Sequence, residues 1–113
     1  MAILIENGTL VSAEGSVAGD LLIEEDRIVA SGAPGVFDAM CAGVECERID
    51  ASGCYVMPGG VDVHTHMEMR FGRIRSSDTF ETGTRAAALG GTTTIVDFAI
   101  QARGQSLQES LHA

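Results

Sequence analysis

A strand–helix–strand succession in the second half of the chain most restricts its possible folds. Val61–His66 predicts a strand, Thr79–Leu89 a helix, and Thr92–Phe98 a second strand rich in β-branched residues. A strand, a crossover helix and a parallel strand form a βαβ unit, right-handed in nearly all cases, which does not cover its own sheet faces. Because Asp97 is the only charge in Thr92–Phe98, we expect that strand to be buried on both faces.

Local signals also predict where the helices begin and end. Ser77 or Asp78 is the expected N-cap of the first helix, and Glu81 stands at capping-box distance from Asp78. Gly90-Gly91 supplies the glycine that a left-handed C-cap favours. A second helix is expected to begin in 105–113.

The first half reads as short strands separated by turn residues. Asn7-Gly8 predicts a hairpin turn, and Glu25-Asp26 predicts a second one. Many short strands at this spacing indicate one wall of a β-sandwich, which needs a partner sheet. The expected strands are Ile3–Ile5, Thr9–Val11, Asp20–Glu24, Arg27–Ala30, Arg48–Asp50 and Cys54–Met57, with a helical turn or two in 36–43.

Charge and cysteine content exclude several function classes. The chain has 7 Lys and Arg against 16 Asp and Glu, a net charge of −9, which disfavours binding to nucleic acid or to anionic membranes. No apolar stretch approaches the roughly 18 residues that cross a bilayer, and the start, MAILIENGTL, lacks a basic region followed by an apolar one, so a secreted or membrane-spanning protein is not expected. Three cysteines, Cys41, Cys46 and Cys54, fit no C-x-x-C pattern, so reduced thiols and a cytoplasmic location are expected.

The chemistry-bearing motif is Asp62-Val63-His64-Thr65-His66. Residues two apart on a strand point to the same side, so His64 and His66 are expected to project together at the end of the strand. Paired imidazoles suit a divalent ion such as zinc, although two such histidines also occur as an ordinary surface or core pair. Pro58-Gly59-Gly60 before the strand and the second strand at βαβ spacing favour the metal.

PGGVDVHTH, with GTTTIVDFAIQ some thirty residues later, resembles the amidohydrolase superfamily, and within it the cyclic amidases of the D-hydantoinase and dihydropyrimidinase group. The resemblance implies an α/β fold in which 58–113 form the first βαβ portion of a (β/α)8 TIM-type barrel. It assigns 1–57 to the N-terminal part of a small β-sandwich domain. The chain is therefore expected to be an incomplete, N-terminal part of such a protein.

The resemblance also implies a site and a reaction. Two divalent metal ions, zinc in most members, would be held by His64 and His66 together with a carbamylated lysine, two histidines and an aspartate on later strands. The reaction would be hydrolysis by metal-activated water, opening hydantoin or dihydropyrimidine rings to N-carbamoyl amino acids. The partners implied are a small cyclic amide or ureide substrate and further copies of the chain in a homotetramer.

The loop after the histidine pair, two aspartates and the third histidine are the other side chains of interest. By position in the loop after the metal pair, Met67, Met69 and Phe71 are the candidates for contacting the substrate ring. Asp97 is expected to play a structural role, since a buried carboxylate needs hydrogen-bond partners. Asp62 is expected to hydrogen bond rather than bind metal, and His112 to be an exposed bystander. No catalytic proton-transfer residue is assigned within the chain.

Two alternatives to the enzyme stay open. One is a non-catalytic dihydropyrimidinase-like scaffold protein, although such proteins have lost metal ligands and this chain has both histidines. The other is an inactive truncated fragment, because two imidazoles are too few for a two-metal site.

Overall fold

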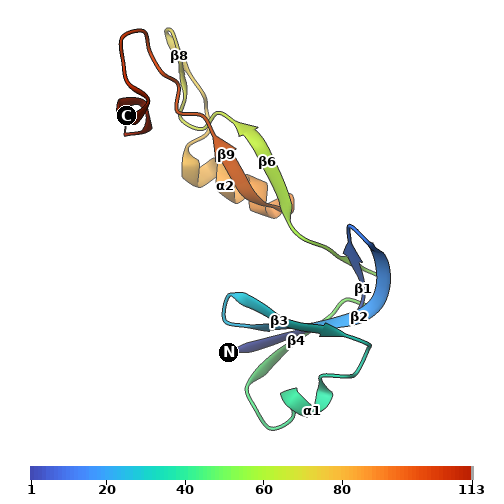
Figure 1. Ribbon diagram of the computed structural model, residues 1–113. Coiled ribbons are helices and arrows are strands. Elements are labelled where there is room, and N and C mark those ends of the chain that lie inside the picture. The colour runs from blue at the N-terminus through green and yellow to red at the C-terminus, as the bar shows by residue number, and fades with distance from the viewer. Residues whose placement is uncertain (113) are drawn as a thin grey trace. The chain divides into compact units, whose positions relative to one another are not determined.

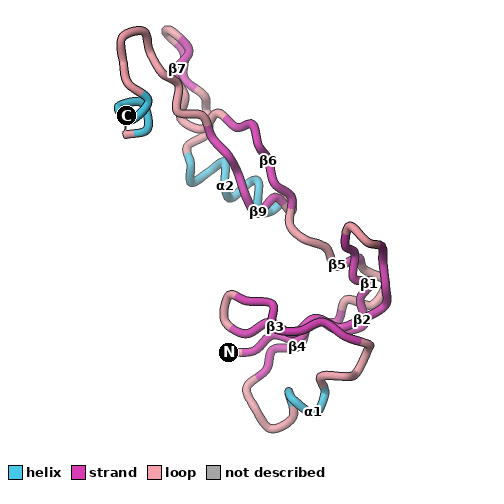
Figure 2. Tube along the Cα trace, viewed as in Figure 1, coloured by secondary structure: helices cyan, strands magenta, loops and turns pink. Residues whose placement is uncertain are grey.

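The computed structural model describes residues 1–112 and divides into two compact units, Met1–Pro58 and Gly59–Ala113 (Figures 1 and 2). The first unit contains β1 (Ala2–Ser12), β2 (Gly15–Glu24), β3 (Arg27–Gly32), α1 (Asp38–Cys41), β4 (Cys46–Asp50) and β5 (Tyr55–Val56). The second contains β6 (Gly60–Thr65), β7 (Arg70–Phe71), β8 (Ile74–Arg75), α2 (Phe80–Leu89), β9 (Thr92–Asp97) and α3 (Leu107–Leu111).

The first unit is built on one mixed sheet of five strands. Its strand order is β3-β2-β1-β4, and β5 also pairs with β1. The β1–β2 and β2–β3 pairs are antiparallel, whereas β4 and β5 run parallel to β1. A small core of Leu4, Leu22, Phe37 and Cys41 lies between this sheet and the α1 segment. The second predicted hairpin, the strands after it and the helical turn are confirmed.

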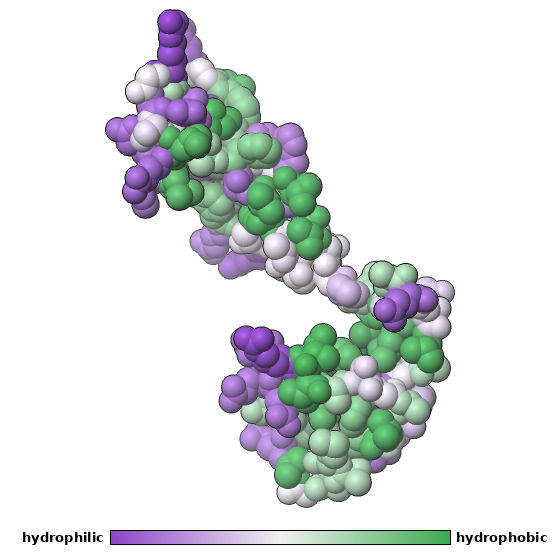
Figure 3. Space-filling model, in the orientation of Figure 1, coloured by the Kyte–Doolittle hydropathy of each residue, from purple (hydrophilic) through white to green (hydrophobic). Residues whose placement is uncertain are grey.

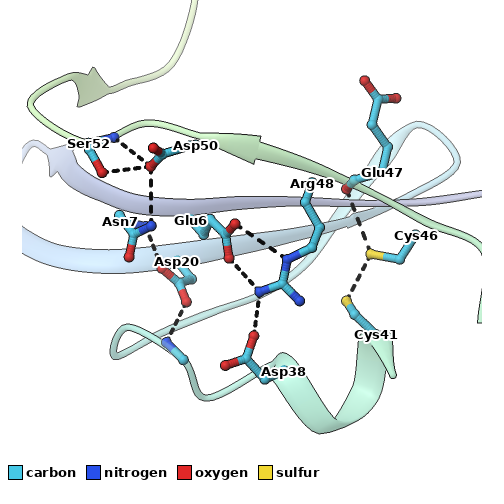
Figure 4. A network of polar contacts seen from close by, with 11 residues as sticks. Glu6, Asn7, Asp20, Asp38, Cys41, Cys46, Glu47, Arg48, Asp50 and Ser52 are labelled. Atoms are coloured by element: carbon cyan, nitrogen blue, oxygen red, sulfur yellow. Dashed lines mark hydrogen bonds and ion pairs between the residues drawn. The ribbon is translucent and has the colours of Figure 1, made fainter. Parts of the chain in front are cut away.

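The predicted hairpin at Asn7-Gly8 is wrong. Both residues lie inside the single long strand β1, which turns only at its end and returns as β2. Asn7 has φ of 61° and marks a bulge, where the β1–β2 register shifts. Its backbone N–H donates to Asp20 Oδ1 at 2.8 Å and its side-chain amide donates to Asp50 Oδ1 at 3.1 Å (Figure 4). These distant acceptors stabilise a bulge where the local sequence favours a turn.

Asp20 is the buried acceptor that organises this region. Asp20 is only 1% exposed to solvent. Its second carboxylate oxygen, Oδ2, accepts a hydrogen bond from the backbone N–H of Gly35 at 2.6 Å. One carboxylate therefore holds both the β1 bulge and the segment that leads into α1. Each of these N–H groups would be unsatisfied without it.

The second unit has a parallel pair of strands at its centre. β6 and β9 pair in parallel, with Gly60 opposite Thr92 and Thr65 opposite Asp97, and α2 packs against β9 (Figure 1). The predicted βαβ succession is confirmed. β7 and β8 form a separate antiparallel hairpin between β6 and α2.

The start of α2 differs from its prediction by one residue. Thr79, rather than Ser77 or Asp78, is the N-cap, and its partner in the capping box is Thr82. The two residues exchange hydrogen bonds, because Thr82 N donates to Thr79 Oγ1 at 3.1 Å and Thr79 N donates to Thr82 Oγ1 at 2.9 Å. Threonine at the third helical position performs the role usually given to Glu or Gln. Gly91, with φ of 85°, follows the helix as predicted.

β9 is not buried on both faces within the described residues. Only Thr92, Ile95 and Asp97 are partly buried, and Val96 is 49% exposed. A sheet of two strands with one helix against it has too few elements to cover both faces. Figure 3 shows apolar side chains at the surface of this unit as a consequence. No helix in 1–112 has the length and apolar character to cross a membrane.

Glycine permits the close approach of the two parallel strands at their start. A Cβ on Gly59 would lie 2.2 Å from Thr93 Oγ1 and 2.8 Å from Thr93 Cβ, and Gly60 N donates to Gly91 O at 2.8 Å. Any larger residue at 59 would therefore push β6 away from β9.

We expect Asp20→Ala to lower the free energy of unfolding by about 2 kcal/mol, because two backbone N–H groups lose the buried carboxylate that accepts from them. The matched control is Asp26→Ala, which removes a carboxylate that is 86% exposed and should change stability by less than about 0.5 kcal/mol. Urea unfolding followed by circular dichroism measures both. Equal effects of the two substitutions would show that Asp20 does not organise the bulge.

We expect Gly59→Ala to destabilise the second unit by about 1–3 kcal/mol through overpacking against Thr93. Gly90→Ala is the control, because its φ is −87° and a Cβ there would have no contact closer than 3.4 Å. Amide hydrogen exchange of β6 and β9 reports on this unit alone. Unchanged protection in Gly59→Ala would contradict the close approach.

Candidate metal centre

The carboxyl end of β6 places two histidines side by side. His64 lies in β6 and His66 follows its last residue, Thr65, which is buried and donates from Oγ1 to Val96 O at 3.3 Å. Because side chains alternate along a strand, Thr65 faces the protein while both histidines face the opposite side. The predicted pairing of His64 and His66 is found.

The two rings converge through their ε nitrogens. His64 Nε2 and His66 Nε2 lie 3.1 Å apart, and the ring centroids are 4.9 Å apart with the planes at 85°. Two nitrogens bound to one tetrahedral zinc ion at about 2.0–2.1 Å would lie about 3.3–3.4 Å apart. The observed separation is close to that value, so the pair fits a divalent ion as two of its ligands.

The rest of a metal site is not supplied by the described residues. Across 1–112, no cluster of three or more His, Cys, Asp or Glu side chains has the spacing to hold an ion. His66 Nδ1 is buried and has no hydrogen-bond partner within the same range, whereas metal-binding histidines usually donate their second N–H to an acceptor. Within 1–112, the pair therefore offers two candidate metal ligands, with no third ligand beside them and no acceptor for His66 Nδ1.

Two phenylalanines line the histidine pair. The Phe98 ring centroid lies 4.7 Å from that of His64 and 5.2 Å from that of His66, and Phe71 meets His66 edge-on at 5.9 Å. These contacts restrict rotation of the imidazoles and surround them with apolar surface. Phe71 was predicted in this region and Phe98 was not. The available signal for Phe98 was its place directly after β9, since parallel strands end at the same edge.

The other two residues predicted to contact substrate lie in different surroundings. Met67 is half-buried, and its Sδ occupies the space next to Gly83 in α2, 2.2 Å from where a Cβ would stand. Met69 is half-buried in the loop, where its carbonyl accepts from Ser76 N at 2.8 Å. The structure therefore brings Phe71 to the histidines and places Met67 against the helix.

Asp97 and Asp62 hold backbone around the pair. Asp97 Oδ2 accepts from Met67 N at 2.7 Å and Asp97 Oδ1 accepts from Phe98 N at 2.6 Å. Asp62 Oδ1 accepts from His64 N at 3.0 Å. Both carboxylates thus have the hydrogen-bonding roles expected of them, and Asp97 joins the segments that follow the two parallel strands.

Glu68 fixes the loop after the histidines and was missed from the sequence. Its backbone is left-handed, with φ of 54°. Its Oε1 accepts from Phe80 N, the first residue of α2, at 3.2 Å, and its Oε2 accepts from Arg75 at 3.3 Å. A carboxylate at a helix N-terminus is favoured by the helix dipole. Nothing local in the sequence indicates this contact, which joins the β7–β8 hairpin to the helix.

His112 is exposed at the C-cap of α3, as expected.

The chain is similar to proteins of a known family. The model of the amidohydrolase family matches residues 55–112. Among curated proteins, a D-hydantoinase of Streptomyces coelicolor is 56% identical over 110 residues, covering 97% of this chain and 23% of that protein. A D-phenylhydantoinase of Escherichia coli is 54% identical over 97 residues, covering 86% of this chain and 20% of that protein.

Solved structures agree. The crystal structure of a dihydropyrimidinase from Brevibacillus agri superposes with a TM-score of 0.87 at 44% identity, covering 99% of this chain and 23% of that one. A D-hydantoinase from Bacillus sp. AR9 gives a TM-score of 0.85 at 47% identity over 97% of this chain. The chain spans less than a quarter of the length of these relatives. It belongs to the amidohydrolase family.

Proposed function

We propose that this chain is the N-terminal portion of a metal-dependent hydrolase that opens hydantoin or dihydropyrimidine rings to N-carbamoyl amino acids. The observation that carries the proposal is the convergence of His64 Nε2 and His66 Nε2 at 3.1 Å, at the carboxyl end of a parallel strand. Relatives that match nearly the whole chain bear the names D-hydantoinase and dihydropyrimidinase.

The architecture proposed for the whole protein is a (β/α)8 barrel with a β-sandwich. β6, α2 and β9 are its first strand, first helix and second strand, and the sheet of β1–β5 is one wall of the sandwich. The support is the parallel β6–β9 pair with a helical crossover, together with the uncovered apolar faces of both units. Barrel enzymes place their chemistry at the carboxyl ends of the strands, where the histidines lie.

His64 and His66 would hold one of two divalent ions, which we propose to be zinc. The bound metal would polarise the ring carbonyl and lower the pKa of a water molecule. The chain contains no lysine, so the bridging carbamylated lysine and the remaining ligands would come from later strands. An acceptor for His66 Nδ1 would come from the same source, which would fix the ring orientation.

The remaining residues of this region would position and enclose the reactants. Phe98 would orient both imidazoles, and Phe71 would orient that of His66, through their ring contacts. Asp97 sets the path of the chain from His66 into the loop through Met67 N. Phe71 and Met69 are proposed to contact the substituent of the substrate ring. Met67 would contribute by supporting that loop against α2.

The competing reading, a non-catalytic scaffold relative, is less well supported. Loss of metal ligands would remove the need for two imidazoles whose nitrogens converge, and both are present with their ε nitrogens facing each other. The relatives compared above carry enzyme names. The resemblance also leads us to propose a homotetramer in the cytoplasm for the intact protein.

We expect the isolated chain to bind Zn²⁺ weakly and through the histidine pair. His64→Ala and His66→Ala should each weaken binding on the order of tenfold or more, since half of the protein ligands are lost. Competition with a chromogenic chelator measures the affinity, and His112→Ala is the matched control. Equal affinity for Zn²⁺ in all three variants would show that His64 and His66 do not bind the metal.

We expect the product of the complete reading frame that encodes this chain to open hydantoin and dihydrouracil rings in a colorimetric assay. His64→Ala should lower kcat/KM by about a thousandfold or more, about 4 kcal/mol of transition-state stabilisation. His112→Ala should leave it unchanged. The 113-residue chain alone should show no turnover with added zinc, because its ligand set is incomplete. Full activity of His64→Ala, or turnover by the short chain, would contradict the proposal.

A further inference from the structure

Two cysteines of the first unit lie next to each other. Cys41 is the last residue of α1 and Cys46 is the first residue of β4. Cys46 Sγ lies 2.8 Å from Cys41 Sγ (Figure 4). The sulfurs would need to approach by about 0.8 Å to reach the bonded distance of a disulfide.

The packing of the two thiols differs in a way that suits a stepwise reaction. Cys41 is 8% exposed and packs with Leu4, Leu22 and Phe37, whereas Cys46 lies partly exposed at the edge of the same cluster. The hydrogen bond with Cys46 and the burial of Cys41 raise the pKa of the Cys41 thiol. Cys46 is therefore the thiol that a solute reaches first.

The surroundings hold the pair in place. Asp38 at the start of α1 forms an ion pair with Arg48 of β4, which also pairs with Glu6 of β1 (Figure 4). This contact and the core contacts of Cys41 fix α1 against β4 on both sides of the connecting loop. The loop turns at Gly43, with φ of 79°. The two thiols are thus preorganised, which lowers the entropic cost of joining them.

We propose that Cys41 and Cys46 form a reversible intramolecular disulfide by exchange with a low-molecular-weight disulfide such as oxidised glutathione. The Cys46 thiolate attacks one sulfur of oxidised glutathione, which releases one glutathione thiolate and leaves a mixed disulfide on Cys46. Cys41 then gives its proton to solvent and attacks Cys46 Sγ, which releases the second glutathione. Two protein thiols are oxidised to one disulfide while one glutathione disulfide is reduced to two thiols.

The third cysteine provides an internal comparison. Cys54 is exposed and lies after the turn that follows β4, where its backbone N–H donates to Ala51 O at 2.9 Å. Within 1–112 its sulfur has no hydrogen bond to the other two. It should therefore stop at the mixed disulfide with glutathione. The proposal therefore predicts an intramolecular disulfide at Cys41 and Cys46 only, and a mixed disulfide with glutathione at Cys54.

The test uses the complete 113-residue chain in glutathione buffers of increasing oxidised fraction, with alkylation of free thiols and mass spectrometry. Trypsin releases Cys41 and Cys46 together in 28–48, and cleavage after Glu45 then separates them unless they are linked. We expect 28–48 to lose two hydrogens and to stay joined after that second cleavage until dithiothreitol is added. Cys54, in 49–70, should instead carry glutathione.

Two comparisons make the outcome decisive. In Cys46→Ser the linked product should disappear, and in Cys54→Ser it should form as in the parent chain. In concentrated urea the preference for the Cys41–Cys46 disulfide should fall, and disulfides of Cys54 with Cys41 or Cys46 should appear as well. Formation of the Cys41–Cys46 link raises the thermal midpoint of the first unit, reversibly with dithiothreitol. Glutathione retained on Cys46, intermolecular dimers, or the same pairing preference in urea would each overturn the proposal.

Discussion

The parallel pairing of β6 with β9 is the interaction on which the second unit depends. It brings the ends of two strands that are thirty residues apart to one edge, so His66 and Phe98 become neighbours. Asp97 then connects the two strand ends by accepting from Met67 N. Without the pairing, the histidines would be two residues on an isolated extended segment, and their rings would lose the contact with Phe98.

Much of this unit could be predicted because its signals are local. Strand alternation places His64 and His66 on one side, and the Ala-rich segment ending at Gly91 indicates the helix between the strands. Asn7 was mispredicted because its conformation depends on Asp20 and Asp50, which lie 13 and 43 residues away. The turn propensity of Asn7-Gly8 agrees with the positive φ of Asn7, but this φ produces a bulge inside β1 and not a hairpin turn.

The missed contacts share a physical cause. Glu68 reaches Phe80 N across the β7–β8 hairpin, and Phe98 meets the histidines only because β9 lies beside β6. In both cases a side chain acts on an element that is distant in sequence. The N-cap of α2 was also misplaced, by one residue. Thr79 and Thr82 form the capping box, in which Thr82 takes the place of the usual Glu or Gln.

The same reasoning explains why the histidine pair is informative although its ligand set is incomplete. Two imidazole nitrogens 3.1 Å apart repel each other when both carry lone pairs toward the same point, unless a proton or a cation lies between them. A proton shared by the pair satisfies one nitrogen of each ring and leaves the buried His66 Nδ1 without a partner. A divalent ion with further ligands, and an acceptor for Nδ1 from later elements, would satisfy every nitrogen at once. The separation of the two ε nitrogens is therefore compatible with the metal centre that we propose, in which other strands would supply the remaining ligands.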